Sequence, residues 1–348
     1  LSSENIASRL PIFENYDKVV QGQTVIEPGM ADAGLIAPFR NREEAPEIHK
    51  VGAALSVDAN PRYSLISPYW GAVNAVVESM RNVAAIGATP WAATDCLNFG
   101  NPEKPEQMWE LVESIRGIKE ALEGIGHLAF PGHPLPVISG NVSLYNESKN
   151  GSVAPSPVIG MVGRIENVDK AITMEFKAAG STIHLIGKRK NELGGSEYYR
   201  QLGHLGAQVP QPDFAEVKKE LALILEAIDQ GIVTAAHDIS DGGLAVALAE
   251  MSFGGRGKCA LSVDVDLSSD FLQFDQKLFS ESGGFVVEVK DESAFNSLAQ
   301  KHDAFTAILG KVTDSEDFII RDNEITLNAK KAVLLDAWLN SLRNLLSS

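Results

Sequence analysis

The first half of the chain alternates between an extended and a helical pattern of apolar residues. The apolar run Gly52–Asp58 predicts a buried strand. A helical pattern follows, with Ser67 and Pro68 as start signals and Gly87 as the stop signal. The apolar positions that recur at helical spacing are Tyr69, Val73, Val76, Val77, Met80, Val83 and Ala84. The chain therefore opens as a strand followed by a helix.

The same alternation continues to about residue 170. Residues 91–97 predict a second strand, and Pro105 stands where a helix begins. The buried stripe of that helix comprises Met108, Leu111, Val112, Ile115, Ile118, Leu122 and Ile125. Residues 157–165 predict another strand. We interpret this part as one α/β domain.

A second block of strands and helices occupies the rest of the chain. Strands are predicted at 182–187, 234–238 and 285–289, and an amphipathic helix at 332–346. Two more helices are predicted from the apolar positions Val217, Leu221, Ile224, Leu225 and Ile228, and from Ala245, Leu248 and Ala249. We place the domain boundary within 167–180 and predict an arm or linker over 1–15, a first domain over 16–172 and a second over 173–348.

Composition and charge exclude several classes of protein. The net charge of −16 argues against a polyanion-binding surface, because nucleic-acid binders concentrate Lys and Arg. No apolar run approaches the ~18 residues of a membrane span. The two cysteines, Cys96 and Cys259, have no metal-like spacing and are expected to be free thiols of a cytoplasmic protein. The start at Leu1, without Met or a signal peptide, suggests a piece of a longer chain.

Two polar stretches follow strand-like runs and carry the candidate chemistry. One is Asp95-Cys96-Leu97-Asn98-Phe99-Gly100-Asn101-Pro102-Glu103-Lys104-Pro105, and the other is Ser139-Gly140-Asn141-Val142-Ser143. An α/β protein gathers ligand groups just beyond the carboxyl ends of its strands, so we expect these residues there. Asp95 and Asn141 offer oxygen ligands suited to Mg²⁺, and Gly140 would let a phosphate approach the backbone.

Both stretches resemble the second half of phosphoribosylformylglycinamidine synthase, an amidotransferase family of purine biosynthesis. Three further stretches resemble it in the same order: Tyr16-Asp17 with Val20-Gln21-Gly22, Ser56-Val57-Asp58-Ala59-Asn60-Pro61-Arg62-Tyr63, and Ala236-His237-Asp238-Ile239-Ser240-Asp241-Gly242-Gly243-Leu244-Ala245. The matches run from about residue 13 to about residue 290. The resemblance implies an aminoimidazole-ribonucleotide-synthetase-like fold. Its amino-terminal domain is an α+β mixed-sheet domain that binds nucleotide and pairs with a partner's sheet, and its carboxy-terminal domain is an αβ sandwich.

The resemblance also implies roles for individual residues. Asp95 and Gly140 would contact ATP, Asn141 would bind Mg²⁺, and Ser143 would bind the ribonucleotide substrate. The stretch around Asp58 departs from the pattern. The family's first half has Glu-Ser-His-Asn-His-Pro at the equivalent place, whereas this chain has Ala59 and Asn60 where the histidines would be expected. We infer that this half has no catalytic histidine base.

Further candidates have a structural explanation as well as a functional one. Asp32 lies in a turn resembling one that related ATP-binding enzymes use near Mg²⁺, and it also fits a plain turn residue. Asp238 and Asp241 precede a helix start at Gly242-Gly243, whose backbone N–H groups suit either a phosphate or a helix cap. Asp58 and Asn98 complete the candidates, and Gly194-Gly195-Ser196 is a second possible phosphate loop.

The function implied is part of an ATP-dependent ligase. The family converts formylglycinamide ribonucleotide and glutamine-derived ammonia to formylglycinamidine ribonucleotide with ATP and Mg²⁺. This chain would need the first half as partner, with a glutaminase subunit or domain, and would form a homodimer when isolated. One alternative is an auxiliary nucleotide-binding and dimerisation module without turnover. Another is a standalone synthetase of the same superfamily, which the motif beginning at Asp95 argues against.

Overall fold

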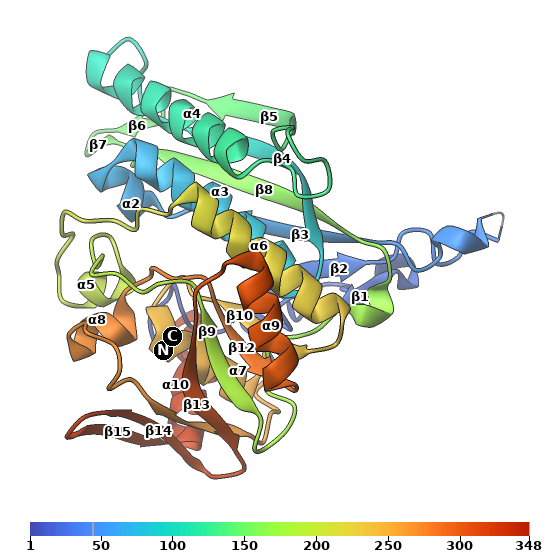
Figure 1. The fold of residues 1–348 in the computed structure, drawn as a ribbon. Helices are drawn as coiled ribbons and strands as arrows, with labels where there is room; N and C mark the ends of the chain where they lie inside the picture. The colour runs from blue at the N-terminus through green and yellow to red at the C-terminus, as the bar shows by residue number, and fades with distance from the viewer. Residues whose placement is uncertain (44, 348) are drawn as a thin grey trace.

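A computed structural model describes residues 1–43 and 45–347. Two mixed sheets form the framework (Figure 1). The first has the order β1 (Thr24–Ile26), β2 (Gly34–Ile36), β3 (Gly52–Asp58), β8 (Ser156–Ile165), β4 (Thr89–Asn98) and β5 (Val137–Ser143). All its pairings are antiparallel except β4 with β5, which run parallel. The carboxyl ends of β4 and β5 therefore meet at one edge of the sheet.

Helices cover one face of this sheet. Asn60 caps α2 (Pro61–Ile66) by accepting the N–H groups of Arg62 and Tyr63, and Ser67 caps α3 (Pro68–Ala85) in the same way. Beside α3 lies α4 (Pro105–Ile125). The burial of β3 alternates, with Ala54 and Ser56 inward and Leu55 and Val57 exposed. The other face of the first sheet is therefore open in this chain.

The second sheet has the order β10 (Val233–Asp238), β12 (Phe285–Val289), β9 (Thr182–Ile186), β13 (Thr306–Thr313), β11 (Ser262–Asp266), β14 (Asp317–Asp322) and β15 (Ile325–Lys330). Its helices are α5 (Glu197–Gln201), α6 (Phe214–Asp229), α7 (Gly243–Phe253), α8 (Phe274–Phe279), α9 (Glu292–His302) and α10 (Lys331–Ser347). The minor elements are α1 (Leu10–Phe13), β6 (Glu147–Ser148), β7 (Gly151–Ser152) and the 3₁₀ turns Val20–Gly22, Pro46–Ile48 and Val168–Lys170.

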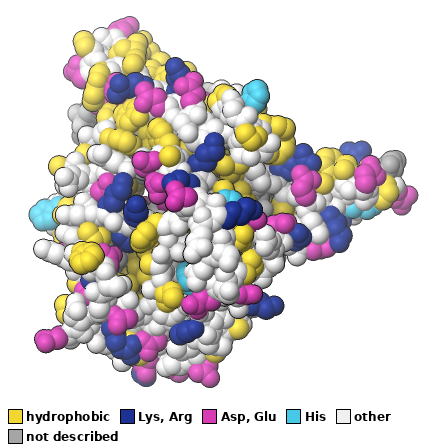
Figure 2. Space-filling view, in the orientation of Figure 1, with side chains coloured by type: hydrophobic (Ala, Val, Ile, Leu, Met, Phe, Trp, Pro, Cys, Tyr) yellow, Lys and Arg dark blue, Asp and Glu magenta, His cyan; other side chains and the backbone are white. Residues whose placement is uncertain are grey.

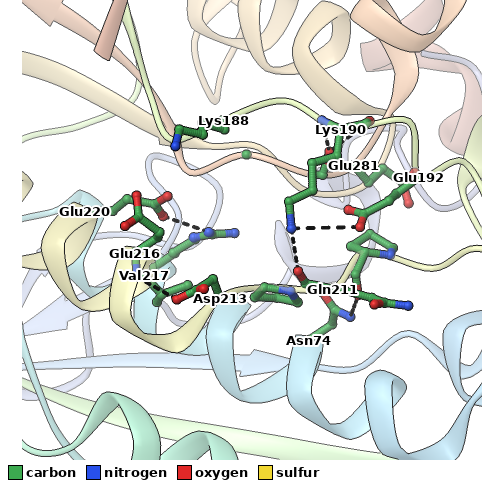
Figure 3. Close-up of a pocket in the computed structure, with 15 residues that line it drawn as sticks. Asn74, Lys188, Lys190, Glu192, Gln211, Asp213, Glu216, Val217, Glu220 and Glu281 are labelled. Atoms are coloured by element: carbon green, nitrogen blue, oxygen red, sulfur yellow. Dashed lines mark hydrogen bonds and ion pairs between the residues drawn. The ribbon is translucent and has the colours of Figure 1, made fainter. Parts of the chain in front are cut away.

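One hydrophobic core joins the two halves. Helix α6 follows β9 in sequence, yet it packs against α3 and α4 as well as against α9 (Figure 1). Its buried residues Leu221 and Ile224 belong to the same cluster as Val76 of α3 and Phe285 of β12. A buried ion pair, Arg81 Nη2 to Glu220 Oε2 at 2.8 Å, also links α3 to α6 (Figure 3). The contact between the halves is thus part of the core.

The amino-terminal segment lies against the second sheet's helices. Ile6, Ala7 and Ser8 are buried, and the N–H of Ser8 donates to the carbonyl of Trp338 on α10. Glu197 at the start of α5 accepts from Asn5 Nδ2 at 3.1 Å. Among the described residues, no helix is long and apolar enough to cross a membrane.

Candidate functional site

The first set of candidate residues lies in matched positions on β4 and β5. In the register of this parallel pair, Asp95 is opposite Gly140, Cys96 is opposite Asn141, and Asn98 is opposite Ser143. The strand predicted over 91–97 contains Asp95 and Cys96, as β4 does. The prediction that the residues from Ser139 to Ser143 lie beyond a strand was wrong, because β5 continues through them. The apolar pattern did not reveal the full length of β5, because this strand carries Ser139, Asn141 and Ser143 and is exposed along nearly all its length.

The alternation of side chains divides this set between the two faces of the sheet. Asp95 lies on the helix-covered face, where it lines a cavity of about 290 Å³ with Ile115 and Lys119 of α4. Burial raises the pKa of its carboxyl. A Cβ on Gly140 would lie 2.5 Å from Asp95 Oδ2, so the absence of a side chain at position 140 makes room for this carboxylate.

Asn141 and Ser143 lie on the opposite, open face. Asn141 Nδ2 donates to Cys96 Sγ at 3.4 Å, and Ser143 Oγ donates to Asn146 Oδ1 at 3.2 Å. Asn98 Nδ2 donates to the carbonyl of Cys96 at 3.1 Å. Asp95, Gly140, Asn141 and Ser143 thus lie on two neighbouring strands. Because they are divided between the two faces of the sheet, they do not line one common pocket of the described residues.

The second set gathers in a cavity of about 360 Å³ between the two halves. Asp32, from the loop between β1 and β2, accepts the N–H of Asp238 on its Oδ2 at 2.9 Å. His237 Nδ1 lies 2.8 Å from Asp32 Oδ1 and 3.5 Å from Asp238 Oδ1. One ligand atom from each of Asp32, His237 and Asp238 lies within 4.8 Å of the others. The three groups are close enough together to hold a cation.

Further buried polar groups surround this site. Asp58, at the end of β3, accepts from Ser56 Oγ at 3.0 Å and from Asn82 Nδ2 at 2.7 Å. Burial raises the pKa of Asp58 to about 8, and the charge of Asp238 adds to this. Burial likewise raises the pKa of Glu78 on α3 well above its usual value, helped by the charges of Asp58 and Asp238. So many carboxyls in one place favour a bound cation.

His237 carries the compensating charge in this group. Burial opposes its charged form, but Asp32, Asp238 and Glu250 outweigh burial and raise the pKa of His237 well above its usual value. Its other nitrogen, Nε2, lies 2.9 Å from Glu250 Oε2, and Glu250 Oε1 accepts from Trp338 Nε1 at 2.8 Å. Helices α7 and α10 therefore fix the orientation of the imidazole.

Asp241, Gly242 and Gly243 lie beside this cavity, and their hydrogen bonds are internal. The N–H of Gly242 donates to Glu281 Oε1 at 2.8 Å, and the N–H of Gly243 donates to the carbonyl of Ser240. Asp241 Oδ1 accepts from Asn60 Nδ2 at 3.3 Å, and burial raises the pKa of Asp241 to about 6. The N–H groups of Gly194, Gly195 and Ser196 also donate to carbonyls of the chain.

The sequence analysis did not propose three polar residues as site candidates: Asn82 and Glu250, which line this cavity, and Glu78, which lies one helical turn from Asn82. Glu78 and Asn82 are one helical turn apart on α3, so an i, i+4 polar pair beside a buried stripe was the signal available. Glu250 gave no such signal. It lies on α7, which is otherwise largely buried and apolar, and only the fold places it against His237.

The oxygen donors of Asp32 and Asp238 fit a divalent cation. Carboxylate and amide oxygens are hard ligands of the kind that Mg²⁺ takes, and Mg²⁺ completes its shell with waters and phosphate oxygens. Asp238 Oδ2 is buried without a hydrogen-bond partner among the described residues, as a ligand atom awaiting a cation would be. The same fit is poorer at Asn141, where a single amide needs carboxylates and phosphates from elsewhere.

The fold and this site define the class of protein. The N-terminal domain of the AIR synthase related proteins matches residues 31–165, and their C-terminal domain matches residues 178–323. The chain belongs to this family, as the sequence motifs had indicated, and its fold is the AIR synthase-like pair of domains.

Within the family, the chain is similar to the phosphoribosylformylglycinamidine synthase subunit PurL. It is 48% identical to that of Methanothrix thermoacetophila over 99% of this chain and 39% identical to that of Thermomicrobium roseum over 98%. In both cases the match covers 44% of the relative, so the chain spans less than half the length of these curated relatives.

Solved structures show the same fold at lower identity. Thermotoga maritima PurL complexed with FGAR is 21% identical with a TM-score of 0.68, covering 82% of this chain and 46% of that one. The same protein complexed with ADP is 20% identical with a TM-score of 0.67, covering 88% and 46%. A HypE–HypF complex gives 15% identity and a TM-score of 0.62, covering 92% of this chain and 96% of that one.

Proposed function

We propose that this chain is one half of a phosphoribosylformylglycinamidine synthase, an ATP-dependent ligase of purine biosynthesis. The proposal rests on the arrangement of four candidate residues on the paired strands β4 and β5. Asp95, Gly140, Asn141 and Ser143 match the family's motif residue by residue and lie at adjacent register positions. Asn141 and Ser143 face the side of the sheet that no helix among the described residues covers.

In this proposal the active site is composite. Asp95 and Gly140 contribute to the ATP site, Asn141 binds Mg²⁺ and Ser143 binds the substrate. A second polypeptide supplies most of the metal-binding carboxylates and the histidine base. Ala59 and Asn60 follow the end of β3 where the family's other half has histidines, and Asn60 serves here to cap α2. Bound Mg²⁺ offsets the charge on the transferring phosphoryl group.

The partners follow from the same reasoning. The chain would pair with the other half of the synthetase and receive ammonia from a glutaminase subunit or domain, in the cytoplasm. The PurLQS assembly of Thermotoga maritima, whose PurL has the same fold, supports an assembly of several subunits. In the absence of the other half, the open face would pair with a second copy of this chain.

A second function is supported by the interdomain cavity. Its carboxyl cluster around Asp32 and Asp238 suits an auxiliary nucleotide with a divalent cation, held for structure and not turned over. Thermotoga maritima PurL has been solved with ADP, ATP and AMPPCP, which supports nucleotide binding in this fold.

Reconstitution separates the two functions. The chain is mixed with a polypeptide carrying the missing half from a close relative, and phosphate release is followed with FGAR, ammonia and MgATP. We expect negligible turnover from the chain alone and recovery in the mixture, abolished by Asp95→Ala but kept by Asp169→Ala, an exposed carboxylate paired with Lys50. Turnover of ~1 s⁻¹ or more by the pure chain would refute the composite site, and an inactive mixture that still binds ADP would favour the auxiliary module.

A further inference from the structure

The chain makes a tight turn directly after Ser143, at the end of β5. Tyr145 has a backbone φ of +59°, although it is not a glycine. This left-handed conformation is strained for a bulky residue and persists only where the surrounding contacts enforce it. The Tyr145 N–H donates to the carbonyl of Gly100 at 3.0 Å, and the Asn146 N–H donates to the carbonyl of Phe99 at 3.2 Å. The turn therefore holds Asn146 beside the ends of both β4 and β5.

The turn places the side chain of Asn146 against Ser143. In an extended strand, residues three positions apart lie roughly 10 Å from each other. Here Asn146 Nδ2 donates to the Ser143 carbonyl at 2.8 Å and to the Phe99 carbonyl at 3.1 Å. The Ser143 hydroxyl oxygen lies 3.2 Å from both Oδ1 and Nδ2 of Asn146. One amide thus contacts both the main chain and the side chain of Ser143.

The two carbonyls determine the orientation of the Asn146 amide. An asparagine amide has two N–H donors, and the carbonyls of Ser143 and Phe99 accept from them. The opposite orientation would place Oδ1 against two acceptor oxygens. Oδ1 is therefore the acceptor for the Ser143 hydroxyl, whose hydrogen has a fixed direction. Phe99 anchors the arrangement, because its side chain is 1% exposed and its N–H donates to the Ser143 carbonyl at 3.0 Å.

We propose that Asn146 is a positioning residue for substrate binding by Ser143. The inference deepens the proposed function and rests on it for the role of Ser143. A hydroxyl that rotates freely loses this freedom when it binds a ligand, and a neighbour that fixes its rotamer beforehand removes part of that cost. Asn146 acts through Ser143 and does not contact the substrate, since both of its polar side-chain atoms bond within the chain.

A double-mutant cycle on substrate affinity tests the proposal. The chain is mixed with the polypeptide carrying the missing half, and FGAR is titrated by calorimetry without ATP. We expect Ser143→Ala to weaken FGAR binding by roughly tenfold, and Asn146→Ala to weaken it by roughly threefold to tenfold. In the Ser143→Ala background, Asn146→Ala should have no further effect, because the hydroxyl that it positions is gone. Asn150→Ala, at an exposed asparagine in the turn between β6 and β7, is the matched control and should bind FGAR like wild type.

Steady-state kinetics on the same mixtures separates positioning from a loss of folded protein. Positioning raises the KM for FGAR and largely keeps kcat at saturating FGAR, whereas a smaller folded fraction lowers kcat. Asn146→Ser, which keeps a small polar residue in the turn, is run through the same cycle and serves if Asn146→Ala does not fold.

The outcomes distinguish this inference from the proposed function. Unchanged FGAR affinity in the folded Asn146 variants, an equal loss in the wild-type and Ser143→Ala backgrounds, or a loss confined to kcat would overturn the role of Asn146 while Ser143 remains a substrate ligand. If Ser143→Ala itself binds FGAR like wild type, the proposed role of Ser143 fails, and the inference fails with it.

Discussion

Gly140 lies directly beneath the carboxylate of Asp95, across the parallel pair β4 and β5. A side-chain carbon at position 140 would come within 2.5 Å of Asp95 Oδ2 and 2.7 Å of its Oδ1. Two residues from separate motifs, 45 positions apart in sequence, therefore depend on each other, because the Asp95 carboxylate occupies the space that a side chain at position 140 would need. The fit explains why a strand interior carries a glycine, a residue that normally weakens strands.

We predict that Gly140→Ala destabilises the chain by about 1–3 kcal/mol, because the new methyl group pushes Asp95 out of its position. Urea unfolding measures the change. In Asp95→Ala the obstacle is gone, so adding Gly140→Ala to it should cost much less. A double-mutant cycle isolates this coupling. Additive effects of the two substitutions would show that the contact does not determine the choice of glycine.

The Arg81–Glu220 pair joins the two halves in a buried position, with side-chain exposures of 10% and 8% (Figure 3). We predict that Arg81→Met destabilises the chain by about 3–5 kcal/mol, because Glu220 is left buried without its partner. The double replacement with Glu220→Leu should recover much of the loss. Lys50→Met, at an exposed pair with Asp169, is the control and should change stability by less than about 1 kcal/mol. Equal losses of stability in Arg81→Met and Lys50→Met would refute the buried-charge explanation.

The sequence predicted the apolar framework well. The bounds predicted for β3 and β12 are those observed, because both strands are apolar runs, and the closing helix α10 is only one residue longer at each end. The amphipathic stripe of α4 likewise marked a real helix. It predicted burial too widely, since Met108, Val112 and Ile115 are exposed; Figure 2 shows hydrophobic side chains at the surface in the part of the molecule where α3 and α4 lie.

The sequence identified individual residues of the cluster Asp32, His237 and Asp238, but not that they lie together. Asp32 and Asp238 were each candidates, but they are 206 residues apart, and nothing local says that they meet. Strand β5 is a comparable case. Its polar residues resemble a loop, and it is held by main-chain bonds to β4, which an apolar pattern does not record. The sequence analysis missed the strands β1, β2, β6, β7, β11 and β13–β15 and the helices α1, α2, α5, α8 and α9.

Nucleotide binding distinguishes the two candidate sites. We predict that the isolated chain binds ADP weakly and only with a divalent cation, because one half offers an incomplete set of ligands at β4 and β5. If the composite site is the one used, Asp95→Ala abolishes binding and Asn141→Ala weakens it. If the interdomain cavity is used, Asp32→Asn abolishes binding instead. Calorimetry on the three variants decides, and unchanged affinity in all of them would place the nucleotide at neither location.

Stability should fall as pH rises when no cation is present. Burial raises the pKa of Glu281 from 4.5 to about 8, helped by the charge of Asp241. The folded chain therefore holds a proton that the unfolded chain releases near pH 4.5. The stability that this contributes is full below pH 4.5 and is lost as pH rises through 8, at up to about 1.4 kcal/mol per pH unit.

Asp58, whose pKa is also raised to about 8, acts in the same direction. We predict that Glu281→Gln flattens the curve of unfolding free energy against pH between 5 and 8, measured in urea with a chelator present. Glu166→Gln, which removes an exposed carboxylate, is the control and should leave the slope as it is. A slope that survives in Glu281→Gln would assign the pH dependence to the other carboxyls.

The open face of the first sheet should drive self-association. Leu55 and Val57 of β3 are 50% and 72% exposed, and they share this face with Asn141 and Cys96. An exposed apolar sheet face is uncommon in a soluble monomer. An isologous contact is the simplest way to cover it, since each copy then provides the surface that the other lacks. We predict a two-fold dimer of this 37.4 kDa chain at ~10 μM.

The contact surface can be tested with single charges. Val57→Lys places an ammonium in the middle of the proposed contact, where it would lose its hydration, so we expect sedimentation equilibrium to show a monomer. Phe271→Lys is the matched control, because Phe271 is a fully exposed aromatic residue between β11 and α8 in the second domain. That variant should remain dimeric. A monomeric wild type at ~10 μM, or a dimer that survives Val57→Lys, would show that this face does not pair with a second copy. Its apolar residues would then have to be covered by the other half of the synthetase alone.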